Sequence, residues 1–193
     1  MSPVCNQSDV LIRPLTSRDL PKVRDLHSKL LPVQYPTSFF LQLLLVPTRA
    51  CFVAYKMAHP TVPIGFISAA IQQPVSTVRC FSSADVSTRA LRDKTTLDPS
   101  RPRLEILTLG VLPSCQHRGL ARRLIQRVAD VLRESCASNS VDGIPICANV
   151  ATNNTEAIEF YKHIGLDVST NVIRNLYRAL SYGSKDAYLV VGV

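Results

Sequence analysis

Two neighbouring segments carry the strongest structural signal in this chain: Leu104-Glu-Ile-Leu-Thr-Leu-Gly-Val-Leu112 and Gln116-His-Arg-Gly-Leu-Ala121. The first part is mostly apolar and predicts a central strand. Residues 113–118 form a predicted loop, and a helix with an apolar stripe follows from Gly119 to about Cys136. A strand that runs through a tight loop into a helix directs backbone N–H groups and the positive end of the helix dipole at one place. We therefore expect an anion site at this junction.

The residues of this loop favour a pyrophosphate. Gly119 lets the backbone approach a ligand closely, and Ala121 is small but keeps helix propensity. Arg118, Arg122 and Arg123 add positive charge beside it. A Rossmann site needs G-x-G-x-x-G and a P-loop needs G-x-x-x-x-G-K-[ST], and the chain contains neither pattern.

Strand and helix signals alternate outward from this unit and predict one mixed α/β domain over residues 1–193. The expected strands are 10–15, 50–56, 63–71, 104–112, 144–150, 167–177 and 187–193. The expected helices are 16–31, 39–45, 119–136 and 153–165. Residues 75–102 are rich in Ser, Thr, Asp, Arg and Pro, and we interpret them as a flexible insertion. The chain stops inside an apolar strand, which suggests a shortened C-terminus.

Composition narrows the class of protein. The chain has 193 residues, of which 46% are hydrophobic and 19% are charged, so we expect a folded protein. Its apolar stretches are shorter than the roughly 18 residues that a membrane-spanning helix needs. The N-terminus MSPVCNQSDV lacks the features of a secretory signal, and we expect a cytoplasmic protein. The six cysteines form no C-x-x-C pair, which argues against a metal site.

The formal net charge is +8, and most of the basic residues are Arg. This charge suits an anionic partner such as a phosphate-bearing cofactor, ribosomal RNA or an acidic protein. Trp is absent and basic residues do not alternate with aromatic ones, so we expect no single-strand nucleic-acid platform and no DNA partner.

The pattern Q-x-x-G-x-A over 116–121 resembles the acetyl-CoA signature of the GNAT N-acetyltransferase superfamily. The segment 153–166, NNTEAIEFYKHIGL, is similar to a second motif of that superfamily, in the same chain order. The resemblance implies an α/β fold with a mixed, mostly antiparallel seven-stranded sheet, splayed at its centre and flanked by about four helices. It also implies acetyl-CoA as cosubstrate and no metal. The residues it assigns to acetyl-CoA are Leu109, Val111, Gln116, His117, Arg118, Gly119, Leu120, Ala121, Arg122, Asn154 and Tyr161.

Two of these residues receive particular roles from the resemblance. Asn154 would hold the pantetheine arm, and Tyr161 would protonate the thiolate leaving group. The alternative for Tyr161 is a core aromatic residue whose hydroxyl finds a backbone partner.

The segment Leu31-Pro-Val-Gln-Tyr35 resembles the loop that binds the first substrate residue in NatE and NatF type protein N-terminal acetyltransferases. Segments 175–178 and 186–188 resemble the C-terminal hairpin of the same group. The resemblance implies an apolar pocket for Met, formed with the help of Leu31, Pro32, Val33, Tyr35, Leu107 and Tyr177. The alternative is that Leu31 and Val33 close a hydrophobic core beneath a loop. The NatE type also implies a helical-repeat auxiliary subunit and the ribosome as partners.

Two positions depart from this group, in which a Tyr and a His act together as general base. Glu105 stands at the Tyr position and Asn149 at the His position. Strand alternation puts Glu105 on one face with Leu107 and Leu109. Glu105 could then act as the base through water, or it could be a strand-end carboxylate paired with Arg101 or Arg103. Asn149 could orient a water molecule or bind the substrate.

We therefore expect an enzyme that acetylates the N-terminal α-amino group of proteins, with a preference for Met followed by an apolar residue. The alternative is a weakly active or inactive subunit that binds acetyl-CoA and serves as an interaction module. A lysine or small-amine acetyltransferase is a third reading, which the Leu31–Tyr35 loop disfavours. The membrane-associated NatF type is disfavoured because no amphipathic extension follows Val193.

Overall fold

The computed structural model describes residues 9–31, 35–72, 102–135, 143–177 and 184–193, and its strands build one sheet. The strands are β1 Val10–Pro14, β2 Arg49–Lys56, β3 His59–Gln72, β4 Arg103–Val111, β5 Ile146–Ala151, β6 Asp167–Ile173 and β7 Ala187–Gly192. The helices are α1 Leu20–Leu30, α2 Thr37–Leu45, α3 Leu120–Ser135 and α4 Thr155–His163. Two 3-10 turns, η2 Ser17–Asp19 and η3 Pro113–Cys115, precede α1 and α3.

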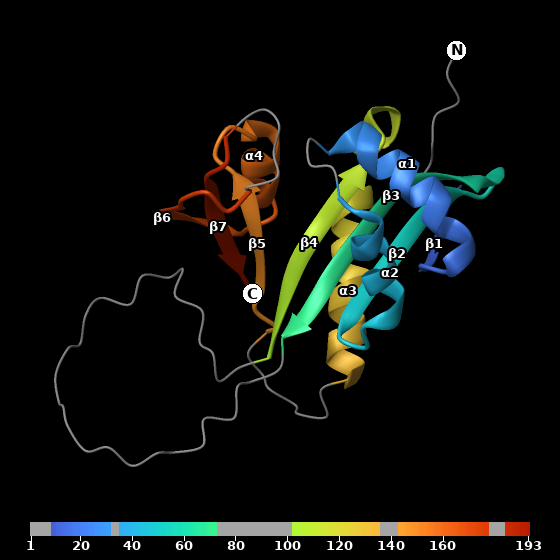
Figure 1. The fold of residues 1–193 in the computed structure, drawn as a ribbon, viewed down its shortest axis with the longest axis horizontal. Helices are drawn as coiled ribbons and strands as arrows, with labels where there is room; N and C mark the ends of the chain where they lie inside the picture. Colours follow the sequence, from blue (N-terminus) through green and yellow to red (C-terminus); the bar gives the residue numbers. More distant parts are fainter. Residues whose placement is uncertain (1–8, 32–34, 73–101, 136–142, 178–183) are drawn as a thin grey trace, which may run out of the picture.

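The sheet has seven strands in the order β1-β2-β3-β4-β5-β7-β6. Neighbouring strands are antiparallel except for the central pair β4 and β5, which is parallel. That pair is short, because only Leu104–Ile106 pairs with Ile146–Ala148. Beyond these residues the two strands diverge, and the sheet opens at its centre (Figure 1). The fold class predicted from the sequence is confirmed.

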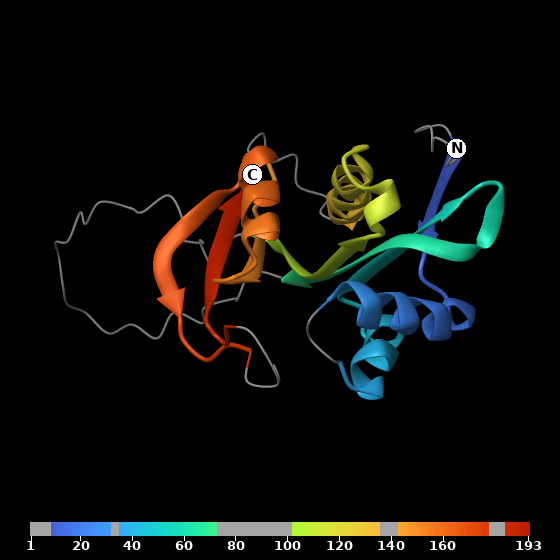
Figure 2. The same ribbon diagram turned by 90° about the horizontal axis from the view of Figure 1, so that it is seen from above.

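The helices cover the two faces of the sheet. Figure 2 shows α1 and α2 on one face and α3 and α4 on the other. Helix α3 follows its predicted apolar stripe, since Leu120, Leu124, Val128 and Leu132 are all buried in the main core. The opposite face has two smaller clusters, one beneath α1 around Val23 and Phe66 and one beneath α2 around Phe40. These clusters fix α1 and α2 to the sheet beside the central opening.

Several predicted boundaries are wrong. The first helix is split, because Asp19 closes a separate turn at Thr16 before α1 begins at Leu20. Helix α2 begins at Thr37, two residues before the predicted start, since Pro36 supplies the extended residue that precedes it. Strand β3 already begins at His59, which the sequence assigned to a turn.

Two strands of the C-terminal half are shorter than predicted. Strand β6 ends at Ile173, since Asn175 takes a left-handed φ of 55° that a strand cannot continue. Strand β5 begins at Ile146, and the residues before it run from Gly143 as irregular backbone. The predicted insertion at 75–102 and the predicted end of α3 at Cys136 lie outside the described residues, apart from Pro102.

Within the described ranges, the helices are all too short or too polar to span a bilayer. In the same ranges, His, Cys, Asp and Glu side chains form no group of three or more that could hold a metal ion.

Candidate functional site

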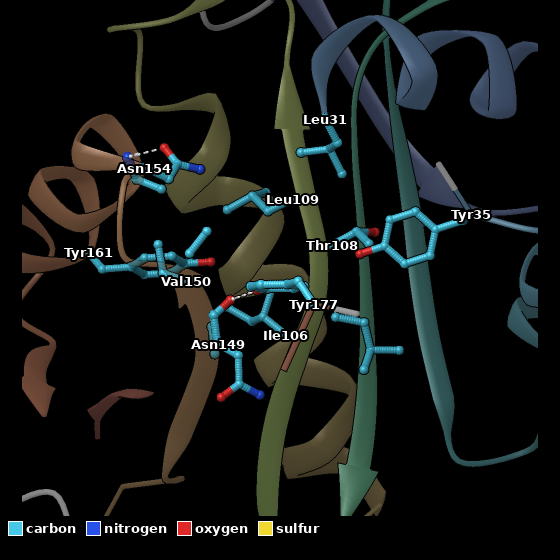
Figure 3. A pocket seen from close by; sticks show the side chains of 14 residues that line it. Leu31, Tyr35, Ile106, Thr108, Leu109, Asn149, Val150, Asn154, Tyr161 and Tyr177 are labelled. Atoms are coloured by element: carbon cyan, nitrogen blue, oxygen red, sulfur yellow. Dashed lines mark hydrogen bonds between the residues drawn. The ribbon is translucent and has the colours of Figure 1, made fainter. Parts of the chain in front are cut away.

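The opening between β4 and β5 contains a pocket of about 100 Å³ (Figure 3). Its lining comes from both strands, from α4 and the residue before it, from residues that follow α1 and precede α2, and from the segment after β6. The lining residues are Leu31, Tyr35, Ile106, Leu107, Thr108, Leu109, Ala148, Asn149, Val150, Ala151, Asn154, Ala157, Tyr161 and Tyr177. Because β4 and β5 stop pairing at Ile106 and Ala148, the facing backbone edges beyond them offer N–H and C=O groups to a ligand. One of these groups is already used, since the Asn149 carbonyl accepts a 2.6 Å hydrogen bond from the Tyr177 hydroxyl.

Strand β4 contains a β-bulge, which determines the face of the sheet on which each of its pocket-lining side chains lies. Thr108 pairs with Ser68 and Ile106 with Ala69, so Leu107 is an extra residue in β4. Leu107 packs beneath α2, and Thr108, on that same face, shares a 2.5 Å hydrogen bond with Ser68.

The bulge reverses the alternation for the rest of β4. Leu109 packs with the core on the α3 and α4 face, whereas Leu107 packs on the α1 and α2 face. The expectation that Glu105, Leu107 and Leu109 share one face is therefore wrong for Leu109. The physical reason is the inserted residue, which shifts every later side chain of β4 to the other face.

The loop before α3 has the backbone shape of an anion site. His117 and Gly119 have φ values of 57° and 72°, and α3 begins at the next residue, Leu120. The Gln116 side chain braces this loop, because its amide nitrogen donates a 3.1 Å hydrogen bond to the Val111 carbonyl. Left-handed residues before a helix turn successive N–H groups into one concave surface.

The other predicted residues of this loop divide into two groups. Leu120 and Val111 are buried in the main core, so only their backbones are available to a ligand. Arg122 is exposed, and Arg118 is half-buried. Of these predicted residues, the two apolar ones are therefore buried and the two arginines remain at least partly exposed.

Helix α4 carries two predicted residues on one face. The Asn154 side-chain oxygen caps the helix by accepting a 3.1 Å hydrogen bond from the Ala157 N–H, which leaves its NH₂ group for a ligand. Tyr161 lies two turns further along, is only 5% exposed, and points its hydroxyl toward β4 (Figure 3). Burial raises the pKa of Tyr161, and the nearby Tyr177 adds a smaller effect in the same direction. Tyr161 therefore keeps its proton at neutral pH.

Tyr35 and Tyr177 define the other half of the pocket. Tyr35 approaches β4 from the side opposite to Tyr161 (Figure 3), and burial raises its pKa. Burial, with a smaller effect of Tyr35, raises the pKa of Tyr177 to about 12. Leu31 and Leu107 contribute an apolar wall beside these two rings. Pro32 and Val33, which the sequence also assigned to this wall, lie outside the described residues.

Asn149 supplies an unused acceptor. Its side-chain oxygen is buried and has no hydrogen-bond partner in the part of the chain that the structure describes. A buried polar atom without a partner costs free energy, which a ligand bearing an N–H or O–H group would recover. Asn149 is one of the residues that line the pocket.

Glu105 lies beside the pocket and does not line it. Its neighbours across the sheet are Ala70 and Cys147, and its carboxylate accepts a 3.0 Å hydrogen bond from Gln72. Burial, and after it the charge of Glu105, raises the pKa of Cys147 to about 11. Arg101, one of its two predicted partners, lies outside the described residues.

Sequence reasoning missed several lining residues, chiefly Thr108 and the small side chains Ala148, Ala151 and Ala157. Of the small residues, only Ala157 belongs to the second motif, whereas Ala148 and Ala151 lie on β5. Thr108 could not be found, because the bulge that turns it toward the pocket has no Gly or Pro to mark it.

Comparison with known proteins identifies the family. Residues 20–166 match the model of the acetyltransferase (GNAT) family. This match spans most of the chain, which therefore belongs to the GNAT acetyltransferase family. A search of curated protein sequences gives no match.

Solved structures share the fold at low sequence identity. The structure of NAA60 from Arabidopsis thaliana in complex with a bisubstrate analogue is 22% identical, with a TM-score of 0.69, and the match covers 95% of this chain and 97% of that one. Naa50 from the same plant, in complex with the bisubstrate analogue CoA-Ac-MVNAL, is 21% identical, with a TM-score of 0.65 and coverages of 96% and 99%. The ribosomal-protein-S18-alanine N-acetyltransferase from Escherichia coli is 16% identical, with a TM-score of 0.62 and coverages of 94% and 92%.

Proposed function

We propose that this chain transfers the acetyl group of acetyl-CoA to the N-terminal α-amino group of proteins, with a preference for Met followed by an apolar residue. The observation that carries the proposal is the pocket between β4 and β5, which has an apolar wall beside two tyrosine rings and an unused acceptor. An unbranched Met side chain suits such a wall because it adapts to irregular apolar surfaces. The fold similarity to NAA60 and Naa50, both solved with bisubstrate analogues, supports this reading.

Acetyl-CoA supplies the acetyl group as an activated thioester, and the chain has suitable groups for each part of it. The N–H groups of the His117 to Leu120 loop and the start of α3 suit the pyrophosphate, with Arg118 and Arg122 beside them. The free NH₂ group of Asn154 suits the pantetheine amides. Backbone N–H groups of β4 near Leu109, beyond the end of the β5 ladder, would polarise the thioester carbonyl.

Three side chains would handle the proton movements, namely Asn149 and Tyr161 of the pocket lining and Glu105 beside it. As the N–C bond forms and the C–S bond breaks, the amine must lose a proton and the sulfur must gain one. Glu105 would accept the proton of the ammonium group through a water molecule, and the Asn149 oxygen would hold a second N–H of the amine. Tyr161, protonated and aimed into the pocket, would donate a proton to the sulfur. Bringing amine and thioester together in one gap supplies much of the acceleration.

A second candidate function is an interaction module within a larger acetyltransferase assembly in the cytoplasm. The observation that favours it is the outer side of α2, where Leu41 is 47% and Leu45 is 76% exposed. Exposed apolar residues at i and i+4 on one helix face suit a protein partner, such as a helical-repeat auxiliary subunit at the ribosome. The net charge of +8 suits a position near ribosomal RNA.

The test is incubation of the purified chain with acetyl-CoA and a peptide that begins Met-Leu, following CoA release and the mass of the peptide N-terminus. A peptide with a blocked N-terminus and an internal Lys is the control. We expect turnover on the free N-terminus only, and a fall in turnover of about 100-fold in Glu105→Gln if that carboxylate is the base. Turnover that Glu105→Gln leaves intact would keep the enzyme and remove Glu105 as base. Binding of acetyl-CoA without turnover would favour the interaction module.

A further inference from the structure

His27 is a buried polar residue that the proposed reaction does not use. It lies on the inner face of α1, is 1% exposed, and its Nε2 atom has no hydrogen-bond partner among the described residues. An apolar side chain would avoid the cost of burying that nitrogen unpaired. The stability of α1 therefore does not account for an imidazole at this position.

Four aromatic rings lie close to His27, and the groove between α1 and α2 reaches it as well. Its ring stacks on Phe66 of β3 with a centroid distance of 4.7 Å and an interplanar angle of 20°. Phe40 of α2 meets it edge-on at 5.3 Å, and Tyr35 does so at 4.8 Å and 83°. Burial lowers the pKa of His27 to about 4, so the ring is neutral at physiological pH. The imidazole thus links the sheet, through Phe66, to the ring of Tyr35.

Tyr35 is the member of this cluster that reaches the proposed active site. It lines the pocket between β4 and β5, and together with His27 it also lines a groove between α1 and α2. Its ring therefore separates the pocket from the groove. Phe39 packs against it at 4.3 Å, and His27 meets it from the buried side. A change in the position of His27 would move this wall of the pocket.

We propose that His27 is a positioning residue, whose ring, held between Phe66 and Phe40, fixes Tyr35 at the acceptor side of the pocket and so sets the affinity for the acceptor peptide. The inference rests on the proposed function, because it names a residue that shapes the acceptor subsite of that reaction. His27 acts through Tyr35 and does not line the pocket itself. Its removal should therefore change acceptor binding while leaving acetyl-CoA binding unchanged.

The experiment is a double-mutant cycle between His27→Leu and Tyr35→Ala, with KM and kcat measured for a Met-Leu peptide and for acetyl-CoA. An edge-on aromatic contact of this kind predicts a rise in the peptide KM of about three- to ten-fold in His27→Leu, with the acetyl-CoA KM unchanged. In the Tyr35→Ala background the same change should have no further effect. His27→Phe, which keeps a ring between Phe66 and Tyr35, should stay within about two-fold of the wild-type KM.

Val23→Ala is the matched control, because Val23 is buried on the same side of α1 and packs in the Phe66 cluster. It should lower the thermal midpoint without a change in the peptide KM. The proposal is overturned if His27→Leu raises the peptide KM by the same factor in the wild-type and Tyr35→Ala backgrounds. It is also overturned if His27→Leu leaves the peptide KM unchanged. If His27→Leu does not fold, His27→Asn takes its place in the cycle.

Failure of the proposed function gives a different result. If the wild-type chain binds the peptide without turning it over, the enzyme proposal fails and the cycle is measured as peptide Kd, where the same coupling supports His27 and its absence overturns it. A chain that binds acetyl-CoA but neither acetylates nor binds the peptide would overturn both proposals.

Discussion

The two halves of the proposed site are built in different ways. On the α3 and α4 side, the backbone of two left-handed residues, His117 and Gly119, and the first turn of α3 would hold acetyl-CoA, although this loop is not part of the pocket lining. On the α1 and α2 side, Tyr35, Tyr177 and Asn149 arrive from separate elements, so side chains make it. A backbone site is specified by a few consecutive residues, whereas a side-chain site depends on every element that positions its members. The acceptor half should therefore be the more sensitive to substitutions far from the pocket.

The largest effect is expected at the start of α1, where one carboxylate anchors the acceptor half. Asp19 accepts two 2.7 Å hydrogen bonds from Arg13, and one of 2.6 Å from Tyr55. Asp19→Ala would leave the Arg13 guanidinium and the buried Tyr55 hydroxyl without their acceptor. We expect this to lower the free energy of unfolding by about 3–5 kcal/mol. Urea denaturation measures this. The exposed pair Lys29–Asp25 is the control, because Asp25→Ala should cost about 0.5 kcal/mol or less.

If the two substitutions destabilise the chain equally, Asp19 is not the anchor described above.

The second prediction assigns different kinetic roles to Tyr161 and Tyr177, which lie in different halves of the proposed site. Tyr161→Phe removes the proton donor and should lower kcat about 100-fold, with little change in the affinity for acetyl-CoA. Tyr177→Phe removes the hydrogen bond to the Asn149 carbonyl and should mainly raise the peptide KM. Steady-state kinetics with both substrates varied distinguishes the cases. The assignment of the halves is contradicted if both variants change the same parameter.

The third prediction concerns pH. Burial lowers the pKa of folded His27 from 6.5 to about 4, so between these values the unfolded chain binds a proton that the folded chain does not. The free energy of unfolding should therefore fall as pH decreases, and His27 alone should account for a loss on the order of 2 kcal/mol between pH 7 and pH 5.

Urea denaturation of the wild-type chain and of His27→Phe at both pH values isolates this contribution, since the remaining groups are shared. The variant should lose less stability on acidification. Equal losses in the two proteins would show that His27 is not held neutral by burial.

The smallest effect is expected in the backbone-built half. Gly119→Val forces a β-branched residue to a φ of 72°, and should weaken acetyl-CoA binding about ten-fold. Gly165→Val is the control, since Gly165 has a φ of 95° after α4, away from the loop, and open space around it. It should lower stability and leave the acetyl-CoA Kd unchanged. Calorimetric titration measures both, and equal weakening of binding would contradict a site built from the loop backbone.

The same difference explains how much of the molecule the sequence predicts. The β4–loop–α3 unit was predicted because its residues are consecutive and its helix has an uninterrupted apolar stripe. The bulge at Leu107 was not, because its cause is the pairing with Ser68 and Ala69, far away in the chain. His27 was missed for a related reason. It lies four residues after Val23 on the buried face of α1, and only the tertiary contacts with Phe66 and Tyr35 give it a role.

The most direct test of the account is the affinity of a bisubstrate analogue in which CoA is joined through an acetyl group to the α-amino nitrogen of a Met-Leu peptide. If acetyl-CoA and a protein N-terminus meet in the gap between β4 and β5, calorimetry should give a Kd at least about 100-fold lower than that of CoA alone. The same linkage made to a Lys side chain of an N-terminally blocked peptide should bind no better than CoA. A Met-Leu analogue that binds only as tightly as CoA, or a Lys analogue that binds more tightly, would contradict the proposed acceptor.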